Sequence, residues 1–137
     1  KIEKIVSNNK KIELNGFIPN TEISEKMSQA KFLIFPSEWY EGFSITLLEA
    51  FANKLPVLSS NIGSMKEIIK DNINGILFKS GDIQDLIKKI NKMIMDPNLL
   101  YSLKEKAYEN YQHLYNKKKN YEILINIYNE TIKNYLK

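Results

Sequence analysis

A short apolar run followed closely by a helix start constrains the fold of this chain more than any other feature. Residues 32–37 read FLIFPS, which is typical of a buried parallel strand, and residues 44–53 read as a helix that is apolar on nearly every side. Further strands are expected at 12–14, 56–59 and 75–78, with helices between them. This alternation predicts a parallel sheet with right-handed crossovers.

Helix boundaries can be read from capping residues and apolar spacing. The predicted caps are Asn20 or Thr21, Ser64 paired with Glu67 in a capping box, Asp82, and Asp96 followed by Pro97. The helix after Asp82 is expected to point six apolar residues inward: Ile83, Leu86, Ile87, Ile90, Met93 and Ile94. Ile2, Ile5 and Val6 fit the last turns of a further helix at the start of the chain.

Two glutamates, Glu41 and Glu49, flank the start of helix 44–53. They follow the carboxyl end of a strand, which is where ligands bind in open α/β sheets. The amide groups of residues 44–46 lack partners within the helix and would favour a diphosphate, through hydrogen bonds and through the helix dipole. A carboxylate one and a half to two turns into the helix cannot help an anion. It is better suited to accept hydrogen bonds from two vicinal sugar hydroxyls.

Eight landmarks follow one another along the chain. They are Phe35-Pro36-Ser37, Glu41-Gly42-Phe43, Leu48-Glu49-Ala50-Phe51-Ala52, Leu55-Pro56-Val57-Leu58, Gly63, Glu67-Ile68-Ile69, Asn74-Gly75-Ile76-Leu77-Phe78 and Gly81-Asp82. In this order they resemble the donor-binding domain of a GT-B glycosyltransferase, and specifically the retaining family 4. The resemblance runs from about Leu14 to Ile94, with a looser match in the last helices. It implies a Rossmann-like parallel sheet with flanking helices, as in the C-terminal half of a GT-B fold.

The resemblance also implies an activity and a site. The activity is transfer of a hexose-type sugar from a nucleotide-sugar donor to a glycan or lipid acceptor, with retention of configuration and with neither a cofactor nor a metal. Glu41 would be the catalytic residue at the donor sugar, Glu49 would bind the ribose, and the main chain of Ile18 would meet the base. The remaining donor-binding residues are Gly42, Phe43, Ser44, Ile45 and Thr46.

Composition sets independent bounds. The chain has 137 residues, a net charge of +4, one histidine and no cysteine, which excludes disulfides, thiolate chemistry and a typical zinc site. No run is long enough for a transmembrane helix, and no signal peptide opens the chain. We therefore expect a cytoplasmic protein, either free or at the inner face of the membrane. All twenty basic residues are lysine, which indicates a bacterium of low GC content. The resemblance implies a role in the synthesis of bacterial polysaccharide or glycolipid.

The resemblance predicts that parts of the family's fold are missing. A GT-B donor domain normally begins with two further strand–helix units, and the chain matches neither of them. The acceptor-binding N-terminal domain is absent as well. We therefore expect residues 1–137 to form a single, truncated nucleotide-sugar-binding domain that ends in C-terminal helices and is inactive alone.

Several alternatives remain open at this stage. The chain could be a non-catalytic GT-B-like interaction module, or a nucleotide-sugar epimerase, although an epimerase would be expected to carry more acid/base residues. No nucleic-acid partner is expected, because the lysines at 117–119 fit a solvated helix start; attraction to anionic lipid, hence peripheral membrane association, is the second reading. Trp39 and Tyr40 could stack on an acceptor or a lipid, or close a domain interface.

The last helix and two departures from the family pattern give further expectations. Residues 120–136 carry an apolar stripe that needs a cover, so self-association is expected: Tyr121, Leu124, Ile125, Tyr128, Ile132 and Tyr135. Asn53-Lys54 stands where the family has a small residue and glycine, and lysine in a left-handed cap costs about 1 kcal/mol relative to glycine. Ser44 stands where glycine or proline is usual and adds a hydroxyl near the donor.

Overall fold

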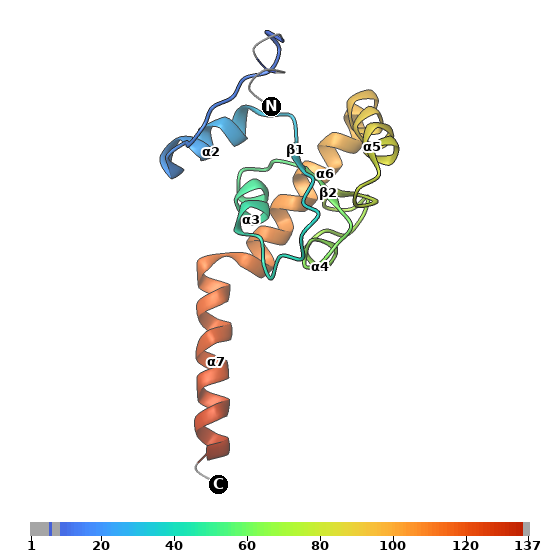
Figure 1. Ribbon diagram of the computed structural model, residues 1–137. Coiled ribbons are helices and arrows are strands. Elements are labelled where there is room, and N and C mark those ends of the chain that lie inside the picture. Colours follow the sequence, from blue (N-terminus) through green and yellow to red (C-terminus); the bar gives the residue numbers. More distant parts are fainter. Residues whose placement is uncertain (1–5, 7–8, 136–137) are drawn as a thin grey trace.

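The computed structural model describes residue 6 and residues 9–135 (Figure 1). Within this part, three strands form one parallel sheet in the order β1-β2-β3. They are β1 (Leu33–Phe35), β2 (Val57–Ser60) and β3 (Ile76–Phe78). Leu33 is paired with Val57, and Leu58 with Ile76. The predicted α/β class, a Rossmann-like parallel sheet with flanking helices, is confirmed.

Helices join the strands and continue beyond them. They are α2 (Asn20–Gln29), α3 (Ile45–Ala52), α4 (Met65–Ile68), α5 (Ile83–Met95), α6 (Pro97–Asn110), a π-helical segment η1 (Tyr111–Tyr115) and α7 (Lys117–Tyr135). Helix α3 connects β1 to β2, and α4 connects β2 to β3. Because all three strands are parallel, their carboxyl ends and the loops that follow them lie at one edge of the sheet.

The core consists of two buried clusters on opposite faces of the sheet. Neighbouring residues of β2 point to opposite faces, and Val57 belongs to one cluster while Leu58 belongs to the other. The first cluster joins α3 and α4 to β2 and includes Leu47, Phe51 and Met65. The second joins β2 and β3 to α5 and α6. All four residues of β2 are buried, as expected for the central strand.

The predictions for the first two strands, at 12–14 and 32–37, were partly wrong. The 32–35 strand is present as β1, but it is not fully buried: Ile34 is 38% exposed, because β1 lies at the edge of the sheet and has one neighbour. Residues 12–14 do not form the predicted strand, and both Ile12 and Leu14 are exposed. A strand needs a second backbone to pair with its N–H and C=O groups, and no described segment pairs with residues 12–14.

The predicted caps have mixed outcomes. Asp82 accepts hydrogen bonds from the amides of Gln84 and Asp85, and Asp96 accepts one from Leu99, so both caps are confirmed. The cap of α2 was wrong, because Pro19 occupies the capping position and makes no side-chain hydrogen bond. The turns predicted around Ile2 and Ile5 lie outside the described residues.

The predicted capping box at Ser64 and Glu67 was also wrong. Ser64 has helical backbone angles, with φ −65° and ψ −19°, rather than the extended conformation of a capping residue. Its Oγ atom is buried and has no hydrogen-bond partner among the described residues. Ser64 therefore occupies the capping position before α4, but its side chain makes no capping hydrogen bond.

Lys54 takes the left-handed conformation that the sequence made unfavourable. Its φ is +54°, its amide donates to the carbonyl of Phe51, and the amide of Leu55 donates to Ala50, which together form a Schellman motif. Two contacts with α6 offset the strain: Nζ lies 3.4 Å from Glu105 and 4.7 Å from the ring centre of Tyr108. The loop thus keeps the course that a glycine would give it.

The predicted inward face of α5 was too wide. Met93 is buried and Leu86 and Ile90 pack partly against the second cluster, but three of the six predicted residues are exposed: Ile83, Ile87 and Ile94. The contacts of α5 are with β3 and α6, which cover only a narrow line along the helix.

Helix α7 projects away from the sheet and its helices (Figure 1). None of its residues is buried, and five members of the predicted apolar stripe are exposed: Tyr121, Leu124, Tyr128, Ile132 and Tyr135. The stripe therefore lacks a cover within the described part of the chain. No helix in that part is both long enough and apolar enough to cross a membrane.

Candidate functional site

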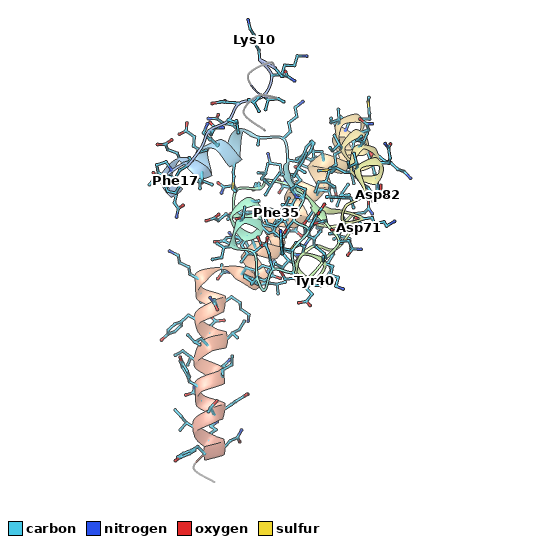
Figure 2. The ribbon with its side chains drawn as sticks, in the orientation of Figure 1. Lys10, Phe17, Phe35, Tyr40, Asp71 and Asp82 are labelled. Carbon is cyan, nitrogen blue, oxygen red and sulfur yellow. The ribbon has the colours of Figure 1, made fainter. Side chains whose placement is uncertain are left out.

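The loop between β1 and α3 is held in place by side chains of the central strand. Ser59 Oγ donates to the carbonyl of Phe35 at 3.2 Å, and Ser60 Oγ donates to the carbonyl of Ser37. Both hydroxyls come from buried positions on β2. The chain that leaves Phe35 is therefore fixed as it reaches the carboxyl edge of the sheet, where Figure 2 shows Tyr40 at the margin of the packed body.

The start of α3 presents amide groups that have no side-chain cap. Ser44 is the capping residue and is only 4% exposed, but its hydroxyl makes no capping hydrogen bond. The first turn carries no acidic residue that would neutralise the positive end of the helix dipole. Gly42, Phe43, Ser44, Ile45 and Thr46 thus lie together at this helix start, as the sequence predicted. The arrangement is chemically suited to an anion.

Glu41 lies where two loops of the carboxyl edge meet. Gly63, in the loop after β2, has φ +55°, and a β-carbon there would be 3.4 Å from the carbonyl oxygen of Glu41 and 3.5 Å from its nitrogen. The backbone of Glu41 is therefore packed against that loop. Its side chain is half-buried and forms no ion pair within the described residues.

Glu49 is half-buried in the second turn of α3, although this helix is otherwise strongly apolar. Its carbonyl accepts a hydrogen bond from Asn53 Nδ2 at 2.8 Å, which fixes the end of the helix. The carboxylate itself has no hydrogen bond or ion pair with any side chain in the part of the chain that the structure describes. A partly buried carboxylate without a partner is available to a ligand.

Phe43 makes a contact that sequence reasoning missed. Its ring centre lies 6.2 Å from that of Tyr115 in η1, and the two rings are tilted by 54°. Burial raises the pKa of Tyr115. Tyr108, Tyr111 and Tyr115 each contact the α3 region: Tyr108 lies under Lys54, Tyr111 packs on the first cluster, and Tyr115 meets Phe43. Their spacing of three and four residues was the signal that could have revealed this shared face.

Ile18 lines a cavity beside α2. The residue is half-buried, and the cavity has a volume of about 220 Å³ and is also lined by residues of α2 and by Leu33 and Leu55, which lie at the amino ends of β1 and β2. The residues that line this cavity include neither Glu41 nor Glu49. A role for the Ile18 main chain in binding the base therefore stays a prediction.

The one histidine of the chain, His113, is exposed on η1. The pKa of Glu109 is lowered by a hydrogen bond from Lys106, by the charge of that lysine and by the charge of His113. Among residue 6 and residues 9–135, no group of three or more histidine, aspartate or glutamate side chains is arranged to hold a metal ion.

Comparison with known proteins identifies the family. Residues 3–110 match the model of the "Glycosyl transferases group 1" family. The match covers more than half of the 137 residues, so the chain belongs to the group 1 glycosyl transferases. This confirms the resemblance as far as the group 1 glycosyl transferases, whereas family 4 and retention of configuration stay predictions.

Three proteins illustrate the relationship. The chain is 29% identical over 131 residues to a poly(ribitol-phosphate) alpha-N-acetylglucosaminyltransferase of Staphylococcus aureus, covering 94% of this chain and 26% of that protein. A sucrose-phosphate synthase from Thermosynechococcus elongatus has the same fold, with a TM-score of 0.86, 24% identity, and coverage of 96% of this chain and 34% of that one.

The third is a structure of a S. aureus TarM variant in complex with Fondaparinux, alpha-GlcNAc-glycerol and UDP. It has a TM-score of 0.79 and 27% identity, and the match covers 93% of this chain and 26% of that one. The chain thus spans about a quarter to a third of the length of the three proteins.

Proposed function

We propose that this chain is the donor-binding part of a retaining, family 4-like glycosyltransferase. The enzyme transfers a hexose-type sugar from a nucleotide-sugar donor to a glycan or lipid acceptor. The observation that carries the proposal is the start of α3 at the carboxyl edge of the sheet, which has no side-chain cap, with a half-buried glutamate on each side of it. Neither glutamate forms an ion pair within the described part of the chain. Family membership and the UDP in the complex of the TarM variant support the same reading.

Each group in this arrangement has a proposed role. The amides of Ile45 and Thr46 bind the diphosphate, because they point from a positive helix end that nothing in the first turn neutralises. Glu49 accepts hydrogen bonds from the ribose hydroxyls. Glu41, which the packing against Gly63 holds in place, acts on the donor sugar. The main chain of Ile18 contacts the base.

In the proposed reaction, the bond between the sugar carbon and the diphosphate oxygen breaks, and the helix-start amides stabilise the negative charge that develops on the leaving group. The acceptor hydroxyl attacks the sugar carbon from the face from which the diphosphate departs and forms the new glycosidic bond, while its proton passes to the departing diphosphate. The configuration is therefore retained. The main contribution of the protein is to hold the acceptor hydroxyl and the leaving diphosphate on the same face of the donor sugar. We propose that no metal ion takes part.

A thermal-unfolding panel tests the proposal. The protein is heated with UDP, GDP, ADP or the corresponding glucose conjugates, each with and without EDTA. A nucleotide at 100 times its dissociation constant adds about 2.7 kcal/mol to the stability of the folded state, which raises the melting temperature by several degrees. One nucleotide family should produce this shift, and EDTA should not reduce it. Failure of every nucleotide to stabilise the protein would contradict the proposal.

A further inference from the structure

Two large aromatic side chains next to Glu41 remain outside the donor site described above. Trp39 and Tyr40 are 82% and 83% exposed, although they lie on a loop of the packed body rather than on a free terminus. They are adjacent in sequence, and the loop continues directly into Glu41 and the start of α3. Exposed aromatic neighbours at the edge of a ligand site mark a contact surface.

The backbone beneath these two rings is fixed. The amide of Trp39 donates to Ser37 Oγ at 3.3 Å, and the carbonyl of Ser37 accepts the hydrogen bond from Ser60 on the central strand. A β-carbon at Gly63 would lie 3.5 Å from the Cα atom of Tyr40, so the loop after β2 supports the backbone from the other side. A ligand that stacks on the rings therefore loses little free energy to ordering the loop.

The charges around the rings restrict the chemistry of a ligand. Glu38 and Glu41 flank the pair in the chain, and Glu38 also lines a cavity of about 240 Å³ with Phe78 and Asp82. The exposed carboxylate of Glu38 repels an anionic lipid headgroup placed over the rings. Both carboxylates accept hydrogen bonds from hydroxyl groups. The site thus suits a neutral molecule with an apolar face and several hydroxyls, which describes a pyranose ring.

We propose that Trp39 and Tyr40 form a stacking platform for a neutral sugar ring of the acceptor, with Glu38 accepting hydrogen bonds from its hydroxyls. This inference rests on the proposed function, because it makes the acceptor a glycan and places it next to the donor at α3. Of the two proposed acceptor classes, glycan and lipid, the inference favours a neutral glycan over an anionic lipid surface. Stacking reads the apolar face of the ring, so several neutral glycans should bind.

Trp39 is the only tryptophan in the chain, so its fluorescence reports directly on the platform. The probes are maltotetraose, chitotetraose and mannotetraose, with vesicles that contain phosphatidylserine as the anionic comparison. We expect a saturable change in emission with at least one tetrasaccharide and none with the vesicles. Tyr40→Ala should weaken tetrasaccharide binding about three- to tenfold, as expected for the loss of one aromatic contact.

Tyr135→Ala is the matched control, because Tyr135 is 90% exposed on α7 and outside the loop. It should leave the affinity for the tetrasaccharide unchanged. The proposal would be overturned by no saturable response to any of the three tetrasaccharides, by equal weakening in the two tyrosine variants, or by a response to the vesicles alone.

UDP binding, measured separately by calorimetry, distinguishes this inference from the proposed function. Tyr40→Ala should bind UDP as the unaltered protein does. Tetrasaccharide binding without nucleotide binding would support the platform and contradict the donor role of α3. Nucleotide binding without tetrasaccharide binding would support the donor role of α3 and contradict the platform.

Discussion

Helices α3 and α7 are both rich in apolar side chains, but the structure uses them differently. In α3, Leu47, Ala50 and Phe51 are completely buried between the sheet and α6. In α7, no residue is buried, and the apolar stripe faces outward from a helix that stands clear of the sheet (Figure 1). Apolar spacing thus shows that a helix has a face to cover, whereas the cover itself depends on which other segments lie nearby.

The two helices also differ in how their charged residues are placed. Glu49 is half-buried on α3, beside a helix start that is suited to an anion, and its carboxylate forms no ion pair with any residue that the structure describes. On α7, Glu122 is exposed and lies 3.8 Å from Lys119, as is usual on a solvated helix. This difference in environment assigns the candidate site to α3.

The largest expected effect comes from the same substitution in both helices. Leu47→Ala should lower the free energy of unfolding by about 2–5 kcal/mol, because it leaves a cavity in the first core cluster. Leu124→Ala in α7 should change it by less than about 0.5 kcal/mol, because that side chain is exposed. Urea unfolding of the two variants measures both values. Equal losses would mean that α7 is packed as α3 is.

A second pair compares a glycine in the packed body with one in the site loop. A β-carbon at Gly75 would lie 2.8 Å from the carbonyl oxygen of Val57, so Gly75→Ala should cost about 1–3 kcal/mol. Gly42→Ala meets no atom within 4 Å and should leave the stability within about 0.5 kcal/mol of the original. Denaturant midpoints decide between them, and a stable Gly75→Ala variant would refute the close approach.

A smaller effect is expected at the end of α3. Lys54→Gly and Lys54→Ala both remove the contacts with Glu105 and Tyr108, but only glycine relieves the backbone strain at φ +54°. The glycine variant should therefore be more stable than the alanine variant by about 1 kcal/mol in thermal unfolding. If alanine proves equal or better, the left-handed conformation of this residue is not the source of strain.

The smallest free-energy effect is expected for self-association through the apolar stripe of α7. The predicted self-association through its stripe should appear as an increase in mass at high concentration in light scattering. Leu124→Lys should abolish that increase, and Lys133→Glu, on the polar face of the helix, should not. A protein that stays monomeric at high concentration would contradict the prediction.

Much of the packed body could be predicted from the sequence. The order of β1, α3, β2 and β3 followed from apolar runs and their spacing, and Asp82 and Asp96 marked helix starts because their side chains bond local amides. Such features depend on neighbours in the chain. The predictions of a strand at 12–14 and of a buried Ile34 failed, because both features require a neighbouring backbone that no local pattern reveals.

The positions of the candidate-site residues along the chain could be predicted, but the contacts that hold them in place could not. The loop from Glu41 to Thr46 and the position of Glu49 followed from the motif order. The hydrogen bonds from Ser59 and Ser60, the packing of Gly63 on Glu41 and the contact of Phe43 with Tyr115 join residues that are between 22 and 72 positions apart. Contacts at such separations arise from the fold as a whole.

Calorimetric titration with the nucleotide that stabilises the protein most tests whether Glu49 binds the ribose of the donor. Glu49→Ala should weaken binding of free nucleotide by about 1.5–3 kcal/mol, as expected for hydrogen bonds to a charged group, and Glu130→Ala, on exposed α7, should have no effect. In the whole enzyme, with its acceptor-binding domain, Glu41→Ala should lower sugar transfer and leave the affinity for free nucleotide unchanged. Equal losses of nucleotide affinity in the Glu41 and Glu49 variants, or none in either, would contradict the account.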